Sequence, residues 1–162
     1  DHYQEALEQY PDIFKGCCMY RVDAYDGIRE MLAFLNEHNI LSAVLSNKPH
    51  PRTLDNVEGV FGKGCFDLVY GEREDKGIRK KPAPDGVWAI MKELGVTGEE
   101  VLYLGDTNTD MRTGKHAGVD TVGVTWGFRD RKELEEFAPR FVVDHPSQVI
   151  QIIKDVNGIG QE

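Results

Sequence analysis

The segment that most constrains the fold is a short apolar run, residues 101–104, followed at once by Gly105 and by two aspartates, Asp106 and Asp110. An apolar run of this length is typical of a parallel strand that is buried on both faces of its sheet. Such strands carry the residues that follow them to the carboxyl edge of the sheet, where open α/β proteins bind ligands. The segment therefore predicts a parallel α/β protein with two carboxylates near a ligand-binding edge.

The spacing of the two aspartates suggests a chemical role. If a helix begins near Thr107, Asp106 is its N-cap and Asp110 lies one turn further along, on the same side. Two carboxylates beside free backbone N–H groups suit a hard cation such as Mg2+ that bridges to a phosphate. An aspartate N-cap followed by a solvated aspartate explains the segment alone about equally well.

Helix and strand patterns alternate along most of the chain, as a doubly wound sheet requires. Strands are expected at residues 40–45, 66–70, 101–105, 121–125 and 141–143, and helices at 26–39, 51–60, 84–94, 108–117, 131–137 and 148–156. The predicted fold class is α/β, with a doubly wound, mostly parallel sheet. Residues 1–22 differ, because they predict a helix of another unit that is broken at Pro11.

Charge and composition restrict the partners. The chain of 162 residues is long enough for one domain, and its formal net charge of −9 argues against broad affinity for nucleic acid. No apolar run is long enough to span a membrane. The three cysteines, Cys17, Cys18 and Cys65, lack zinc spacing and indicate reduced thiols. We therefore expect a cytoplasmic protein with no membrane partner, whose oligomeric state the sequence does not indicate.

Three further residues could contact a phosphate. Ser46 follows the strand predicted at 40–45, so its hydroxyl and the Asn47 N–H could both donate to a phosphate oxygen, although a serine that caps the next turn is an alternative. Lys81 precedes Pro82, which favours an extended backbone, and its ammonium could neutralise phosphate charge. A solvated basic loop, 79–81, is the alternative for Lys81. The order of hydroxyl, lysine and paired carboxylates on successive strand–helix units favours the phosphate site.

Three segments carry a resemblance to a known family. LSNK (45–48), KKPAPDG (80–86) and LGDTNTDM (104–111) resemble the second, third and fourth motifs of the haloacid dehalogenase-like hydrolases. VGVTWGF (122–128) resembles the phosphoglycolate phosphatase branch of that family. The resemblance extends over residues 20–155 and implies a Rossmann-like core with a helical cap.

The resemblance also implies roles for five residues. Ser46 and the Asn47 N–H would bind the phosphoryl group, and Lys81 would hold both the phosphate and the nucleophile. Asp106 would ligate Mg2+, and Asp110 would take part in catalysis by supporting the metal site or Lys81. The implied activity is Mg2+-dependent hydrolysis of a small phosphorylated metabolite, such as 2-phosphoglycolate, through an aspartyl-phosphate.

One family motif, an apolar strand that ends in DxDGT and supplies the nucleophilic aspartate, is not found. The nearest sequence, VDAYDGI (22–28), has its carboxylates three positions apart and no apolar strand before it, so we interpret it as a linker from the cap. Residues 1–19 would then be the C-terminal remnant of the cap, and residues 20–162 a core that lacks its first strand. The nucleophile is expected outside this chain, and the chain alone is expected to be inactive.

Four alternatives remain open. A sugar phosphomutase of the same superfamily usually has Glu-Asp-Ser where this chain has Gly105-Asp106-Thr107, which favours a hydrolase. Pyrophosphatase activity within the same branch is a second alternative, which a substrate panel would separate. A receiver-like domain phosphorylated on Asp106 would need an earlier acidic pair after a strand, which is not visible. An inactive α/β binding module is expected if the gene holds no nucleophile motif.

Overall fold

The structure is a computed structural model that describes residues 22–160. The predicted cap remnant at residues 1–19, its helix, and Cys17 and Cys18 lie outside the described residues. Of the described helices, none is both long and apolar enough to cross a membrane.

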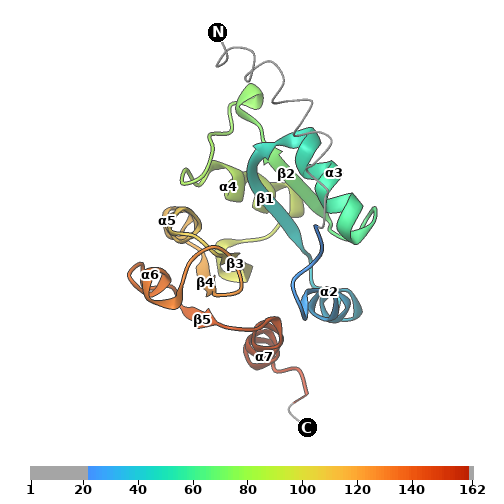
Figure 1. The fold of residues 1–162 in the computed structure, drawn as a ribbon, viewed down its shortest axis with the longest axis vertical. Coiled ribbons are helices and arrows are strands. Elements are labelled where there is room, and N and C mark those ends of the chain that lie inside the picture. The colour runs from blue at the N-terminus through green and yellow to red at the C-terminus, as the bar shows by residue number, and fades with distance from the viewer. Residues whose placement is uncertain (1–21, 161–162) are drawn as a thin grey trace.

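Helices and strands alternate as the sequence predicted (Figure 1). The strands are β1 (Ala43–Pro49), β2 (Leu68–Glu72), β3 (Leu102–Gly105), β4 (Asp120–Val124) and β5 (Phe141–Val143). The α-helices are α2 (Ile28–Glu37), α3 (His50–Phe61), α4 (Asp85–Leu94), α5 (Asn108–Ala117), α6 (Arg131–Glu135) and α7 (Pro146–Asn157). Two short 3-10 helices, η1 (Glu74–Lys76) and η2 (Gly98–Glu100), lie in the connections.

Each strand pairs in parallel with its neighbours, which confirms the α/β fold class. The described strands form two sheets: β1 pairs with β2, and β4 lies between β3 and β5. Figure 1 shows the two sheets one above the other, joined through α4. A strand between β1 and β3 would join the two sheets into one. That this chain lacks such a first strand stays a prediction, and the gap between β1 and β3 is where the strand would lie.

Side chains alternate across β4 and show why helices cover both of its faces. Val122 and Val124 belong to the apolar core, together with residues of α2, β5 and α7. The opposite face carries Thr121 and Gly123, which approach Gly114 of α5 and Leu134 of α6. This alternation is the period of two that a strand imposes on its side chains, and it produces the doubly wound arrangement that was expected.

Strand β1 differs from its prediction, because it begins three residues later and continues through Ser46 and Asn47. Residue 40 is still held by α2, since the Ile40 N–H donates to the Leu35 carbonyl at 2.8 Å. The pairing with β2 is regular to Leu45 and resumes only at Pro49, with extra residues on β1 between them. Ser46 and Asn47 therefore lie in an irregular part of the strand, and such irregularities re-aim side chains.

Candidate active site

The first turn of α5 is capped by Thr107, not by Asp106 as predicted. Thr107 has extended backbone angles, and its hydroxyl oxygen accepts a hydrogen bond from the Asp110 N–H at 3.2 Å. Threonine is itself a favoured N-cap, and it takes this role one residue after Asp106. Asp106 thus lies outside the helix, and the expectation that both aspartates share one helical face is wrong.

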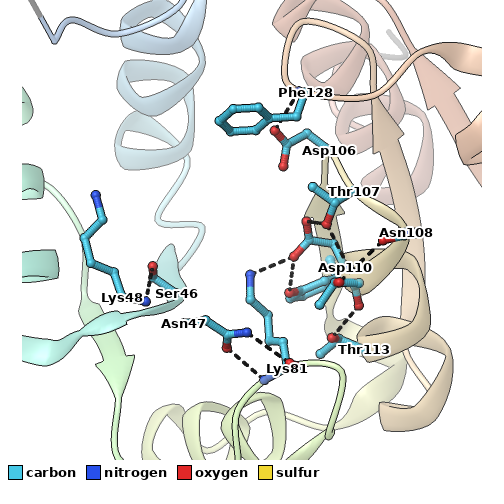
Figure 2. A network of polar contacts seen from close by, with 12 residues as sticks. Ser46, Asn47, Lys48, Lys81, Asp106, Thr107, Asn108, Asp110, Thr113 and Phe128 are labelled. Atoms are coloured by element: carbon cyan, nitrogen blue, oxygen red, sulfur yellow. Dashed lines mark hydrogen bonds and ion pairs between the residues drawn. The ribbon is translucent and has the colours of Figure 1, made fainter. Parts of the chain in front are cut away.

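Asp110 forms a nearly buried ion pair with Lys81. The Lys81 Nζ lies 2.7 Å from Asp110 Oδ1, and the side chains are 15% and 8% exposed. The Thr107 hydroxyl donates to Asp110 Oδ2 at 2.6 Å, and the Tyr103 hydroxyl donates to Oδ1 at 3.3 Å. Both carboxylate oxygens therefore accept hydrogen bonds from the protein itself (Figure 2).

The surroundings of Asp110 favour its charged form. Burial acts to raise the pKa of the Asp110 carboxyl, but the Lys81 ammonium and the hydrogen bonds to Lys81, Thr107 and Tyr103 outweigh burial, so this pKa lies below its ordinary value. Burial and the charge of Asp110 raise the pKa of the Tyr103 phenol. The phenol therefore stays protonated and donates a hydrogen bond to Asp110. Lys81 and Asp110 thus face each other as a cation and an anion at neutral pH.

Asn47 holds the main chain of the same lysine. Its side-chain Nδ2 donates to the Lys81 carbonyl at 2.9 Å, and its Oδ1 accepts from the Lys81 N–H at 2.8 Å. Sequence reasoning had assigned Asn47 only a backbone N–H, so this paired contact was missed. The residues are 34 positions apart in the sequence, so the contact depends on the folded arrangement of the chain.

Ser46 lies beside this lysine. The Ser46 hydroxyl oxygen accepts a hydrogen bond from the Lys48 N–H at 3.1 Å, so the local capping role that was the alternative is present. Since the oxygen accepts in that contact, the hydroxyl proton remains available to a phosphate oxygen. Ser46, Asn47 and Lys81 line one small pocket, so the structure brings these three predicted residues together.

Asp106 is held by a different element. Its Oδ2 accepts a hydrogen bond from the Phe128 N–H at 3.0 Å, in the loop that follows β4. The Phe128 side chain is 84% exposed at this edge. Figure 2 shows Asp106 directed toward Phe128, and Asp110, in the first turn of α5, directed toward Lys81.

Two glycines make room for the aspartates. A Cβ on Gly105 would overlap the Asp110 side chain, and a Cβ on Gly127 would overlap the Asp106 carboxylate. From the sequence, Gly105 was named only as the residue that ends the strand, and Gly127 was not named. Both stood within segments that were singled out, 104–111 and 122–128, but only the structure shows which atoms approach them.

The donor set fits part of a magnesium site. Within residues 22–160, no group of three or more His, Cys, Asp or Glu side chains could hold a metal ion. Mg2+ is commonly bound by one or two carboxylates together with waters and phosphate oxygens. Asp106 has one carboxylate oxygen engaged by Phe128 and can offer the other, whereas Asp110 is engaged at both oxygens.

The segment nearest to the missing motif forms no strand. Asp23 makes an ion pair with Arg29 at 3.1 Å, and Asp26 lies 3.4 Å from His145. Residues 22–25 have no regular secondary structure. Asp23 therefore pairs with an arginine of α2 and Asp26 lies fully exposed beside His145, while the interpretation of this segment as a linker stays a prediction.

Comparison with known proteins identifies the family. A family model described as haloacid dehalogenase-like hydrolase matches residues 1–124. This chain belongs to the haloacid dehalogenase-like hydrolases. The motifs quoted from its sequence were those of this family.

Relatives of this haloacid dehalogenase-like hydrolase are named as phosphatases. It is 30% identical over 159 residues to the phosphoglycolate phosphatase of Pectobacterium atrosepticum, a match that covers 98% of this chain and 67% of the relative. It is 28% identical over 131 residues to the pyrophosphatase PpaX of Listeria monocytogenes, covering 81% of this chain and 59% of that protein.

The fold is shared with a crystal structure from Lactobacillus delbrueckii subsp. bulgaricus, of a protein assigned as a phosphoglycolate phosphatase. The TM-score is 0.85 and the sequence identity 31%, and the match covers 93% of this chain and 62% of that one. This haloacid dehalogenase-like hydrolase chain therefore spans 59–67% of the length of these three proteins.

Proposed function

We propose that the complete protein containing this chain is a cytoplasmic, Mg2+-dependent phosphatase that hydrolyses a small phosphomonoester resembling 2-phosphoglycolate. The observation that carries the proposal is the Lys81–Asp110 pair, because it fixes the ammonium of a lysine that lines the same pocket as Ser46. Names of two relatives, phosphoglycolate phosphatase and pyrophosphatase, support a phosphate-ester substrate.

In this mechanism the chain's residues position and stabilise the phosphoryl group. Ser46 donates its hydroxyl proton to a phosphoryl oxygen, and the Asn47 N–H donates to another. The Lys81 ammonium offsets the charge that gathers on the phosphoryl oxygens in the transition state, while Asp110 keeps it aimed. Electrostatics and positioning therefore supply most of the rate acceleration by these residues.

Asp106 is the residue proposed to hold Mg2+. When bound, this ion supplies additional positive charge next to the phosphate. Asp110 was also predicted as a metal residue, and its engagement with Lys81 favours the supporting role over direct ligation. Binding of Mg2+ should therefore be lost in Asp106→Asn and only weakened in Asp110→Asn.

The nucleophile is proposed to come from outside this chain, on a strand that lies between β1 and β3. The intermediate would be an aspartyl-phosphate, formed as an aspartate oxygen attacks phosphorus and the alcohol leaves, and then hydrolysed by water. The 162 residues alone would then be inactive.

The test is phosphatase activity of the complete polypeptide and of this chain on its own. With Mg2+ and 2-phosphoglycolate, the complete polypeptide should turn over and the chain should not. Activity that survives Lys81→Ala, Asp106→Asn or the removal of Mg2+ would overturn the assignment. If the complete polypeptide were inert toward every phosphate ester tried, the binding-module alternative would replace it.

Two further activities are separated by the same assay. Pyrophosphate belongs in the substrate panel because of the name of the Listeria relative. A phosphomutase is disfavoured by one observation: the space that a Glu side chain would need at position 105 is taken by Asp110. Faster turnover of pyrophosphate than of any phosphomonoester would change the substrate class and leave the site intact.

A further inference from the structure

The loop between β4 and α6 is anchored at both ends by one carboxylate. Asp144, directly after β5, accepts a hydrogen bond from the Thr125 hydroxyl at its Oδ1, with a distance of 2.7 Å. Its Oδ2 accepts from Arg131 NH2, also at 2.7 Å. Thr125 is the first residue after β4 and Arg131 the first residue of α6, so Asp144 contacts both ends of the connection 125–130.

The tip of this loop carries the contact to the candidate active site. The Phe128 N–H donates to Asp106 Oδ2, and Gly127 lies so close to Asp106 that a Cβ there would overlap the carboxylate. The orientation of Asp106 therefore depends on where the loop places its backbone. The two contacts of Asp144 contribute to that placement, together with the hydrogen bonds from the Thr125 N–H to the Val143 carbonyl and from Arg131 to the Val142 carbonyl.

We propose that Asp144 is a positioning residue that orients Asp106 through this loop. By holding Thr125 and Arg131, it keeps the Phe128 N–H against one oxygen of Asp106 and leaves the other oxygen for a cation. The inference rests on the proposed role of Asp106 in binding Mg2+.

The Asp144 contacts should contribute little to the stability of the whole fold. The side chains of Arg131 and Asp144 are 43% and 61% exposed, and ion pairs this exposed contribute little to global stability. The hydrogen bond from Thr125 and the charge of Arg131 lower the pKa of the Asp144 carboxyl, so it is charged at neutral pH. Loss of the Asp144 contacts should therefore loosen the loop locally and leave the fold as stable as before.

The experiment compares Asp144→Asn with Asp120→Asn in the complete polypeptide. Asp120 is a matched control, because it also pairs with an arginine, Arg140, but at the opposite end of β4. Two quantities are measured: the Kd for Mn2+, used as the probe ion, and the amide hydrogen exchange rate of Phe128.

In Asp144→Asn we expect the Kd for Mn2+ to rise about tenfold and the Phe128 amide to exchange about fivefold faster. Changes of this size correspond to the loss of about one hydrogen bond. Asp106→Ala should accelerate the same amide, since it removes the acceptor. Asp120→Asn should leave both quantities within about twofold of the wild type, and thermal unfolding should be unchanged in both asparagine variants.

Three outcomes are decisive. An unchanged Kd in Asp144→Asn overturns the inference, even if the loop becomes more mobile. Equal effects of Asp120→Asn and Asp144→Asn overturn it as well, because they reveal a general stability effect. Mn2+ binding that survives Asp106→Ala instead overturns the proposed role of Asp106, and Phe128 exchange then still decides whether Asp144 positions that side chain.

Discussion

Asp110 is a residue on which two opposing effects act. Removing a carboxylate from water is costly, and in this structure the cost is offset by Lys81 and two hydroxyl donors. Removing one partner of such a pair leaves the other charge without compensation. For this reason, removing one member of the pair should destabilise the fold by more than the intact pair stabilises it.

We predict that Asp110→Asn lowers the free energy of unfolding by about 3 kcal/mol, because it leaves the Lys81 ammonium nearly buried without its anion. Urea denaturation at pH 7 measures this change. The control is Asp23→Asn, which removes an exposed ion pair with Arg29 and should leave the denaturation midpoint unchanged. Equal midpoints in all three proteins would contradict the prediction.

The effect of Asp110→Asn on stability should depend on pH. Because the pKa of Asp110 is lower in the folded than in the unfolded state, its contribution is fully present above the unfolded pKa, about 4, and is lost as the pH falls through the folded pKa. The difference in free energy of unfolding between the wild type and Asp110→Asn should therefore become smaller as the pH is lowered below about 5. A difference that stays constant over this range would show that the charge is not responsible.

Asn47 gives a prediction about catalysis. Asn47→Ala removes both hydrogen bonds to the Lys81 main chain, which allows the ammonium to move away from the phosphate position. In the complete polypeptide we expect kcat to fall by up to about 100-fold, since a displacement near 1 Å has such effects. Asn157→Ala, at the end of α7, is the control and should keep the wild-type kcat. A wild-type kcat in Asn47→Ala would show that Asp110 alone positions Lys81.

At the scale of elements, alternating patterns predicted every α-helix and strand of the described residues, but neither the short 3-10 helices η1 and η2 nor all of the ends. The end of β1 and the N-cap of α5 were predicted wrongly: Thr107 takes the cap in place of Asp106, and extra residues on β1 extend it past Leu45. The side-chain contact of Asn47 could not be predicted, because it joins segments whose distance depends on the finished fold.

The contact between β3 and α5 yields an element-scale prediction. Gly105 ends β3 directly against Asp110 of α5, so Gly105→Ala forces the two elements apart. We expect the free energy of unfolding to fall by about 2 kcal/mol, the usual effect of overpacking. Gly98→Ala is the matched control, because a Cβ there makes only ordinary contacts. If both variants denature at the same urea concentration, the close approach at Gly105 is not limiting.

At the scale of the whole molecule, the two separate sheets leave β1 and β3 with one paired neighbour each, whereas β4 has two. An unpaired strand edge leaves each N–H and C=O along it without a protein partner, which is unfavourable once that edge is covered. The proposed first strand would pair with both edges at once. It would also bring its nucleophile to the edge where Ser46, Lys81 and Asp106 lie, so completing the sheet and completing the site would be one event.

Hydrogen exchange tests this link between sheet and site. In the isolated chain, amides of β4 should exchange more slowly than those of β1 and β3. In the complete polypeptide, residues 43–49 and 102–105 should slow by about tenfold or more, while residues 120–124 change little because they are already paired on both sides. If the amides of β1 and β3 exchange as fast in the complete polypeptide as in the isolated chain, no strand lies between β1 and β3. The aspartyl nucleophile would then have to reach Lys81 from some other part of the polypeptide.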